Sequence, residues 1–168
     1  MRRPILLATM LMLFISTVPC RANGNVFISM EGDCRHPAIA TEKNDLYMAW
    51  IVAGNKKADL FFRRSADEGK NWSTAQKLSN KNSDCYPPAL AADSGIVHLA
   101  WIDYGETVDG ELYYTRSNDG GLTWEKNKIL VRDANGACHP SLFSRGYEVY
   151  LLWQNVDKKI YFKATRVT

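Results

Sequence analysis

Short blocks of apolar, β-branched and aromatic residues recur along the chain, and the same order of blocks appears three times. The clearest blocks are DLYMAWI (45–51), IVHLAWI (96–102) and EVYLLWQ (148–154), which have the composition that strands prefer. A further strand-like block follows each one, at ADLFFRRS, ELYYTRS and KIYFKAT, and the first two units continue into AQKLS and NKILV. From residue 23 onward we find no helical periodicity. The pattern predicts an all-β fold built from antiparallel strands.

The recurrence is regular enough to define a repeat of about 52 residues. Cys34, Cys85 and Cys138 are 51 and 53 residues apart, and the tryptophans at 50, 101 and 153 are 51 and 52 apart. The repeats span approximately 33–83, 84–136 and 137–168. Four antiparallel strands in each unit are typical of a β-propeller blade. A solenoid or a sandwich built from the same meanders is the alternative.

One eight-residue turn occurs in two of the three units, as SADEGKNW (65–72) and SNDGGLTW (117–124). Its Ser and Asp side chains can bond to nearby backbone groups, its Gly accepts a positive φ, and its Trp can cover the hairpin. We expect a structural role for the matched residues, which are Ser65, Asp67, Gly69, Trp72, Ser117, Asp119, Gly121 and Trp124.

These octapeptides, with the flanking x-P-A-[IL]-A segments, resemble the Asp-boxes, or BNR repeats, of the sialidase (neuraminidase) superfamily in exported bacterial proteins. The resemblance implies three four-stranded blades per chain, half of a six-bladed propeller. Val167 and Thr168 fall at the positions of Asp119 and Gly120 in the second box, so the third unit lacks the fourth strand, and NVFISM (25–30) is expected to act as a swapped or closing outer strand. Two copies that exchange this strand would form a homodimer of six blades. An open three-blade chain and a fragment of a longer chain are the alternatives.

The first 22 residues combine a basic start with an apolar run of 14 residues, which predicts a secretory signal peptide. The mature chain is therefore expected to be secreted or periplasmic, and Pro19 argues against a lipid anchor on Cys20. No later apolar run has the length of a membrane span. The chain has 21 Lys+Arg and 18 Asp+Glu, and the signal peptide holds three of the basic residues and no acidic one. The remainder is neutral, which gives no support to nucleic-acid binding.

In a blade, the start of the first strand and the end of the second lie at the same end of the sheet, which makes that end the default ligand site. The candidate ligand-binding residues there are Arg35, His36, Tyr86, Asp103, Tyr104, His139 and Gln154. The octapeptide turns are expected at the opposite end, because strand direction alternates.

The resemblance also implies a sialidase centre, with a Tyr–Glu nucleophile pair, an Asp acid/base and three arginines that clamp a carboxylate. CRHPAI places Arg35 where the first of these arginines would stand, but the same segment recurs as CYPPAL with Tyr86 in that place. Three convergent arginines cannot be assembled. We expect a non-catalytic module that binds carbohydrate and needs no cofactor. The alternatives are a sialidase-type glycoside hydrolase with a degenerate or dimer-completed site, and a scaffold for protein–protein interaction.

The three cysteines are expected at one level around the propeller axis, as small packing residues of the inner strands. Disulfides between blades and a soft-metal site made by Cys34, Cys85 and Cys138 are the alternatives. His98 aligns with Tyr47 and Tyr150, which predicts a packing role for this histidine.

Overall fold

The computed structural model describes residues 32–166 except 56, 106, 133 and 146. Within these residues the regular structure consists of eleven strands, and there is no helix, so the all-β prediction is confirmed. Among the described residues no helix is long and apolar enough to cross a membrane. The predicted signal peptide (1–22) and outer strand (25–30) lie outside the described residues.

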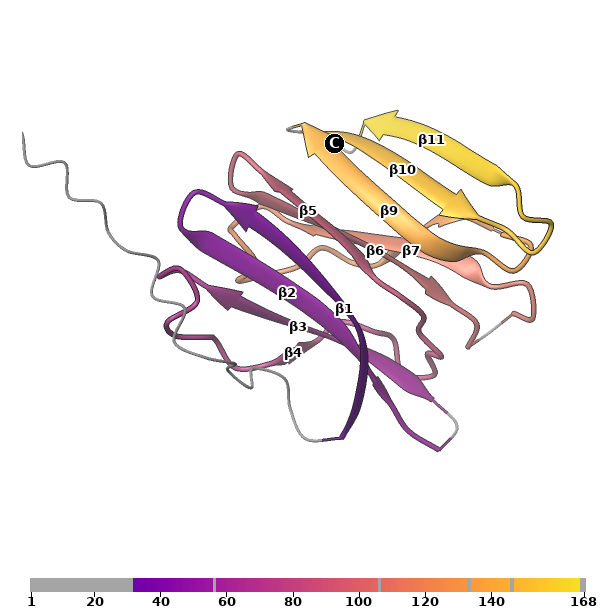
Figure 1. Cartoon of the computed structure of the whole chain (residues 1–168), viewed down its shortest axis with the longest axis horizontal. Helices are drawn as coiled ribbons and strands as arrows, with labels where there is room; N and C mark the ends of the chain where they lie inside the picture. Colours follow the sequence, from indigo (N-terminus) through magenta and orange to yellow (C-terminus); the bar gives the residue numbers. More distant parts are fainter. Residues whose placement is uncertain (1–31, 56, 106, 133, 146, 167–168) are drawn as a thin grey trace, which may run out of the picture.

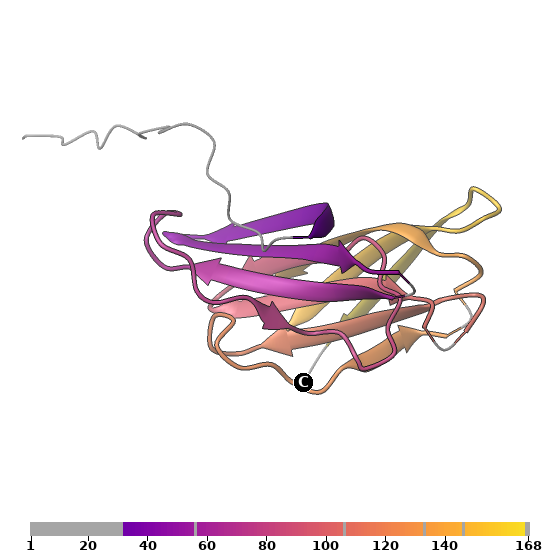
Figure 2. The same cartoon turned by 90° about the horizontal axis from the view of Figure 1, so that it is seen from below.

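Consecutive strands form three antiparallel sheets (Figure 1). The first contains β1 (Asp33–Glu42), β2 (Asp45–Ala53), β3 (Ala58–Ser65) and β4 (Gln76–Lys77), and its order can be followed from one side to the other in Figure 2. The second contains β5 (Ala89–Asp93), β6 (Ile96–Asp103), β7 (Glu111–Ser117) and β8 (Lys128–Val131). The third contains β9 (Cys138–Arg145), β10 (Glu148–Gln154) and β11 (Ile160–Arg166). In the described residues the third sheet thus has three strands, not the expected four.

The first strands of the three sheets, β1, β5 and β9, lie side by side and point in the same direction (Figure 1). Their starting residues therefore share one end of the molecule, together with the ends of β2, β6 and β10. The turns that follow β3 and β7 lie at the other end. This arrangement separates the candidate ligand-binding residues from the octapeptide turns.

Apolar side chains from facing sheets form the core. Between the first and second sheets, the buried residues include Tyr47, Ala49, Ile51, Leu60, Phe62, Val97, Leu99, Trp101 and Tyr113. Between the second and third sheets, they include Ala100, Ile102, Leu112, Ala137, Leu151 and Trp153. Successive side chains of a strand point to opposite faces, so the middle sheet contributes Trp101 to one interface and Ala100 to the other. Each interface is a sheet-on-sheet contact.

Strand register corrects the expectation that the three cysteines occupy one level. Cys34 pairs with Val52, two residues after Trp50, and Cys85 pairs with Asp103, two residues after Trp101. Cys138 instead pairs with Gln154, the residue directly after Trp153. Because a shift of one residue moves a side chain to the opposite face of a strand, Cys138 is not equivalent to the other two. The unequal spacings of 53 for cysteine and 52 for tryptophan already contained this shift.

Candidate functional site

A cavity of about 310 Å³ opens at the end of the molecule where β1 begins and β2 ends. The start of β3 and the segment before β5 complete its wall. The polar residues of its lining are Arg35, His36, Asn55, Lys57, Asp84 and Tyr86. Three of the seven predicted ligand-binding residues, Arg35, His36 and Tyr86, therefore line one cavity. Lys57 was not among the predicted residues, although its place in the loop after β2 is the signal that points to it.

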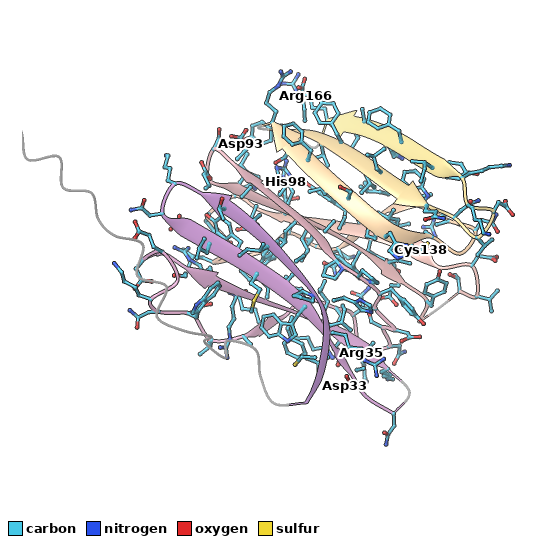
Figure 3. All side chains as sticks on the ribbon, in the orientation of Figure 1. Asp33, Arg35, Asp93, His98, Cys138 and Arg166 are labelled. Atoms are coloured by element: carbon cyan, nitrogen blue, oxygen red, sulfur yellow. The ribbon has the colours of Figure 1, made fainter. Side chains whose placement is uncertain are left out.

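The guanidinium group of Arg35 is held by its neighbour Asp33. Arg35 Nε donates to Asp33 Oδ1 at 2.8 Å, and Arg35 Nη2 donates to Asp33 Oδ2. Both residues lie at the start of β1 (Figure 3). The hydrogen bonds from Arg35 lower the pKa of Asp33. Because an ion pair exposed to solvent is weak, an anionic or polar ligand can compete with Asp33 for this guanidinium.

Two tyrosines form the aromatic part of the site. The rings of Tyr86 and Tyr104 pack edge to face with centroids 4.9 Å apart. Tyr86 is 45% exposed and lines the cavity, whereas Tyr104 donates its hydroxyl to the carbonyl of Ala137 at 3.0 Å. Burial raises the pKa of Tyr104, and Cys138 and Tyr86 add to this effect. Tyr104 thus supports the ring of Tyr86 and connects the second sheet to the third.

Asp103, another predicted ligand-binding residue, is buried and hydrogen-bonded within the fold. This residue is only 5% exposed. Its Oδ1 accepts the backbone N–H groups of Asp84 and Gly105, both at 2.9 Å, and the thiol of Cys85 lies 3.8 Å from Oδ2. A buried carboxylate with these partners fixes the adjoining loops. Burial and the negative charge of Asp103 raise the pKa of Asp84 in the cavity wall.

The remaining two candidates, His139 and Gln154, lie on the third sheet and are not part of the lining of this cavity. His139 and His36 nevertheless share a backbone feature, because their φ values are 51° and 53° and each precedes a proline. Register shifts in the pairing of β1 with β2 and of β9 with β10 occur at these positions. β-Bulges of this kind turn side chains away from the regular alternation.

The described arginines other than Arg35 do not converge on the cavity. Arg64 donates to the Gly120 carbonyl at 3.0 Å, and Arg116 pairs with Glu125 at 2.6 Å. Ion pairs also join Arg132 to Glu111 at 3.0 Å and Arg145 to Glu148 at 2.9 Å. These distances place each guanidinium in a local contact on its own sheet or with the next. The described residues therefore present one arginine to the cavity.

The structure does not assemble the cysteines into a metal site. No group of three His, Cys, Asp or Glu side chains that could hold a metal ion occurs in the described part of the chain, and the cysteines there are not joined to one another by disulfides. Cys85 is buried, and this burial raises the pKa of its thiol. His98 is also buried, with Nδ1 2.7 Å from the hydroxyl of Tyr114.

The first octapeptide forms a hydrogen-bonded turn at the far end of the strands. The Ser65 hydroxyl donates to Asp67 Oδ1 at 2.8 Å and accepts the N–H of Gly69 at 2.8 Å. Asp67 Oδ1 accepts the N–H of Asn71 at 2.8 Å, and Trp72 Nε1 donates to the Gly69 carbonyl at 3.2 Å. The hydrogen bonds from Asn71, followed by that from Ser65, lower the pKa of Asp67 to about 2.

The second octapeptide repeats the hydrogen bonds of the serine and the aspartate but not that of the tryptophan, and it also packs on the neighbouring sheet. Ser117 donates to Asp119 Oδ1 at 2.6 Å and accepts the Gly121 N–H at 2.7 Å. The bond from Ser117, followed by those from Thr123, lowers the pKa of Asp119 to about 2. The ring of Trp124 meets Phe62 of the first sheet edge to face at 4.8 Å. These contacts give the turn a role in joining sheets, away from the cavity.

No family model and no curated protein matches this chain. Solved structures do match its fold. An α-L-arabinanase from Penicillium chrysogenum is similar with a TM-score of 0.54 and 14% identity over 77% of this chain and 46% of its own. An α-L-arabinofuranosidase from Fusarium graminearum is similar with a TM-score of 0.56 and 16% identity over 80% of this chain and 45% of its own. A Trypanosoma rangeli sialidase in complex with the inhibitor DANA is similar with a TM-score of 0.56 and 12% identity over 85% of this chain and 30% of its own.

These similarities show the fold, which is that of a sialidase-like β-propeller, as the octapeptides predicted. The similar proteins are glycoside hydrolases that act on carbohydrates. The chain spans less than half the length of each of them.

Proposed function

We propose that this chain is an exported, non-catalytic propeller module of the Asp-box type that binds carbohydrate in the cavity lined by Arg35, His36 and Tyr86. The supporting observation is the combination, in one cavity of about 310 Å³, of an accessible aromatic ring with cationic and hydrogen-bonding side chains. A tyrosine ring offers an apolar face to a sugar ring, and the polar groups around it match hydroxyl or carboxylate groups.

The absence of catalysis is proposed from the charges around the cavity. Clamping a sugar carboxylate as sialidases do requires several arginines, but the described arginines 64, 116, 132 and 145 are engaged elsewhere. The carboxylate in the cavity wall, Asp84, lies beside buried Asp103 and not beside a tyrosine–glutamate pair. The similar hydrolases support a carbohydrate ligand, and the side chains of this cavity support binding without bond cleavage.

A glycan array with the purified chain tests the ligand class. Tyr86→Ala and Arg35→Gln should weaken binding to any glycan identified there by about tenfold or more. Tyr147→Ala is the matched control for the tyrosine, because Tyr147 is 48% exposed in the turn between β9 and β10 and Tyr86 is 45% exposed in the cavity. Arg145→Gln is the control for the arginine, because Arg145 also forms an exposed ion pair with a nearby residue.

Three other results would contradict the proposal. Failure to bind any glycan would favour a protein–protein scaffold. Equal losses in the control variants would place the ligand elsewhere. Turnover of a fluorogenic sialoside or arabinoside, abolished by Arg35→Gln, would make the chain a glycoside hydrolase.

Export of the chain and formation of a homodimer by strand exchange are also part of the proposal. Secretion or periplasmic location follows from the predicted signal peptide, and cleavage after Ala22 is checked by N-terminal sequencing of the exported protein. The predicted homodimer through exchange of residues 25–30 rests on the three-stranded third sheet, whose strand β11 has a free edge among the described residues.

A further inference from the structure

One face of the third sheet exposes a cluster of large apolar side chains. The cluster consists of Phe143, Leu152, Ile160 and Phe162, whose exposed fractions run from 44% to 69%. Leu152 and Phe162 are register partners, and Ile160 pairs with Gln154 on the same face. The opposite face of β10, which carries Leu151 and Trp153, is buried against the second sheet. Contiguous apolar surface on a folded domain marks an interaction site more often than isolated apolar residues do.

The same positions on the other two sheets are covered. Counting from the tryptophan of each repeat, Phe162 corresponds to Phe62 and Tyr114, which are 0% and 1% exposed. Ile160 corresponds to Leu60 and Leu112, both fully buried. In the first sheet these residues are covered by the second sheet, and in the second sheet by the third. The exposed cluster is therefore the half of a sheet-on-sheet interface that would receive a further sheet.

On the complementary face, the first sheet exposes one large apolar side chain. Ile39 is 64% exposed, whereas its register equivalents Leu90 and Leu142 pack against the preceding sheet. Within the described residues no sheet precedes the first one. Trp50, on the same face as Ile39, is already buried within its own chain, so Ile39 and the nearby turn remain to make the contact.

We propose that the third sheet of one copy docks on the first sheet of a second copy, as the first sheet docks on the second within the chain. In that internal interface, the ring centroids of Phe62 and Trp124 are 4.8 Å apart, and the Phe62 ring packs against Gly121 of the turn. Phe162 is the residue at the Phe62 position, and Gly69 and Trp72 are the matching turn residues of the first sheet. Phe162 of one copy thus packs on Gly69 and Trp72 of the other.

A second copy is the favoured occupant because this chain carries both halves of the interface. The third sheet exposes Ile160 and Phe162, and the first sheet exposes Ile39, at positions that are buried or packed wherever the interface forms inside the chain. Two copies that meet head to tail can make the contact twice, so closure covers both exposed faces at once. The inference deepens the homodimer of the proposed function, and it does not depend on carbohydrate binding, since the residues involved lie outside the cavity.

The oligomeric state of the whole purified chain, measured by size-exclusion chromatography with light scattering over a range of concentrations, tests the interface. We expect a dimer. Phe162→Asp and Ile39→Asp should each raise its dissociation constant by about tenfold or more, because each buries a charge in an apolar contact. Both side chains are more than 60% exposed in the single chain, so far-ultraviolet circular dichroism should show an unchanged fold. Ile160→Asp is a second variant on the third sheet, and Leu122→Asp, on a side chain 63% exposed, is the control.

Mixing the two variants distinguishes this interface from a symmetric one. A mixed dimer of Phe162→Asp with Ile39→Asp has one interface with both substitutions and one with neither. The mixture should therefore form dimers at lower concentrations than either variant alone. A wild-type chain that stays monomeric at every concentration would overturn the proposal. Loss of the dimer with Phe162→Asp but not with Ile39→Asp, and no rescue on mixing, would overturn it as well, because the third sheets would then pair with each other.

Discussion

The contact between Phe62 and Trp124 provides the sharpest test of what the octapeptide turn does. Phe62 is fully buried between the first and second sheets, and its ring meets Trp124 edge to face at 4.8 Å. Truncating a buried phenylalanine to alanine costs about 3–5 kcal/mol, against a total stability of about 5–15 kcal/mol for ordinary domains. With a urea m-value of about 2 kcal/mol per M, Phe62→Ala should lower the urea midpoint by about 1.5–2.5 M. Phe62→Leu is the milder replacement if the alanine variant does not fold.

A double-mutant cycle isolates the contact itself. We expect Phe62→Ala and Trp124→Ala together to cost less than the sum of the two single changes, with a coupling of about 0.5–1.5 kcal/mol for the aromatic pair. Far-ultraviolet circular dichroism should follow the unfolding, because removing a tryptophan changes the fluorescence signal. Leu122→Ala is the control, since its side chain is 63% exposed in the same turn and should change stability by less than about 0.5 kcal/mol.

Strict additivity of Phe62→Ala and Trp124→Ala would refute the reasoning. It would mean that the turn stabilises its own hairpin without joining the two sheets. The proposed docking of Phe162 on Gly69 and Trp72 of a second copy would then lose its structural precedent.

Two further predictions concern the same turn. Gly121 has a φ of 85°, and a Cβ added there would lie 2.6 Å from Phe62, whereas Gly95 has a φ of 78° and open space around it. Gly121→Ala should therefore lower the free energy of unfolding, measured by urea titration, by at least about 1 kcal/mol more than Gly95→Ala does. Equal losses in the two variants would contradict the steric collision with Phe62. The pKa of Asp119 is lowered to about 2, below the value of about 3.9 for an unfolded chain, so ionised Asp119 stabilises the native state above about pH 4, and this contribution is lost as the pH falls toward 2. The melting temperature of Asp119→Ala should thus lie below that of the wild type at pH 6 and approach it near pH 2, and a gap that stays constant with pH would count against this account.

The turn was predictable from the sequence because its interactions are local. In each octapeptide the hydrogen bonds join residues two to four positions apart, such as Ser117 to Asp119 and to Gly121. The recurring apolar blocks likewise predicted the strands, since the β-branched and aromatic composition of each block can be read from neighbouring residues. The fold class followed from these two features together.

The candidate site was predictable only in part. The repeat placed Arg35 and Tyr86 at the same end of their sheets, and both line the cavity. The same reasoning included Asp103, because a polar residue after a strand looks like a loop residue in the sequence. Its burial depends on the approach of residues 84 and 85, which belong to another segment of the chain. Desolvation of this kind is a property of the packed structure.

The sequence by itself thus determined the all-β class, the threefold recurrence and the turn chemistry, because periodicity and short-range hydrogen bonds are encoded residue by residue. The tertiary structure decided which matched positions of the three repeats have the same strand face and the same burial. The cysteine and tryptophan spacings differ by one residue in the sequence, and the strand pairing shows that this difference places Cys138 on the other face of its strand relative to Cys85. The tertiary structure also left Phe162 exposed where Phe62 is buried. Both outcomes depend on strand register and on the presence of a facing sheet, and these are set by contacts between residues far apart in the chain.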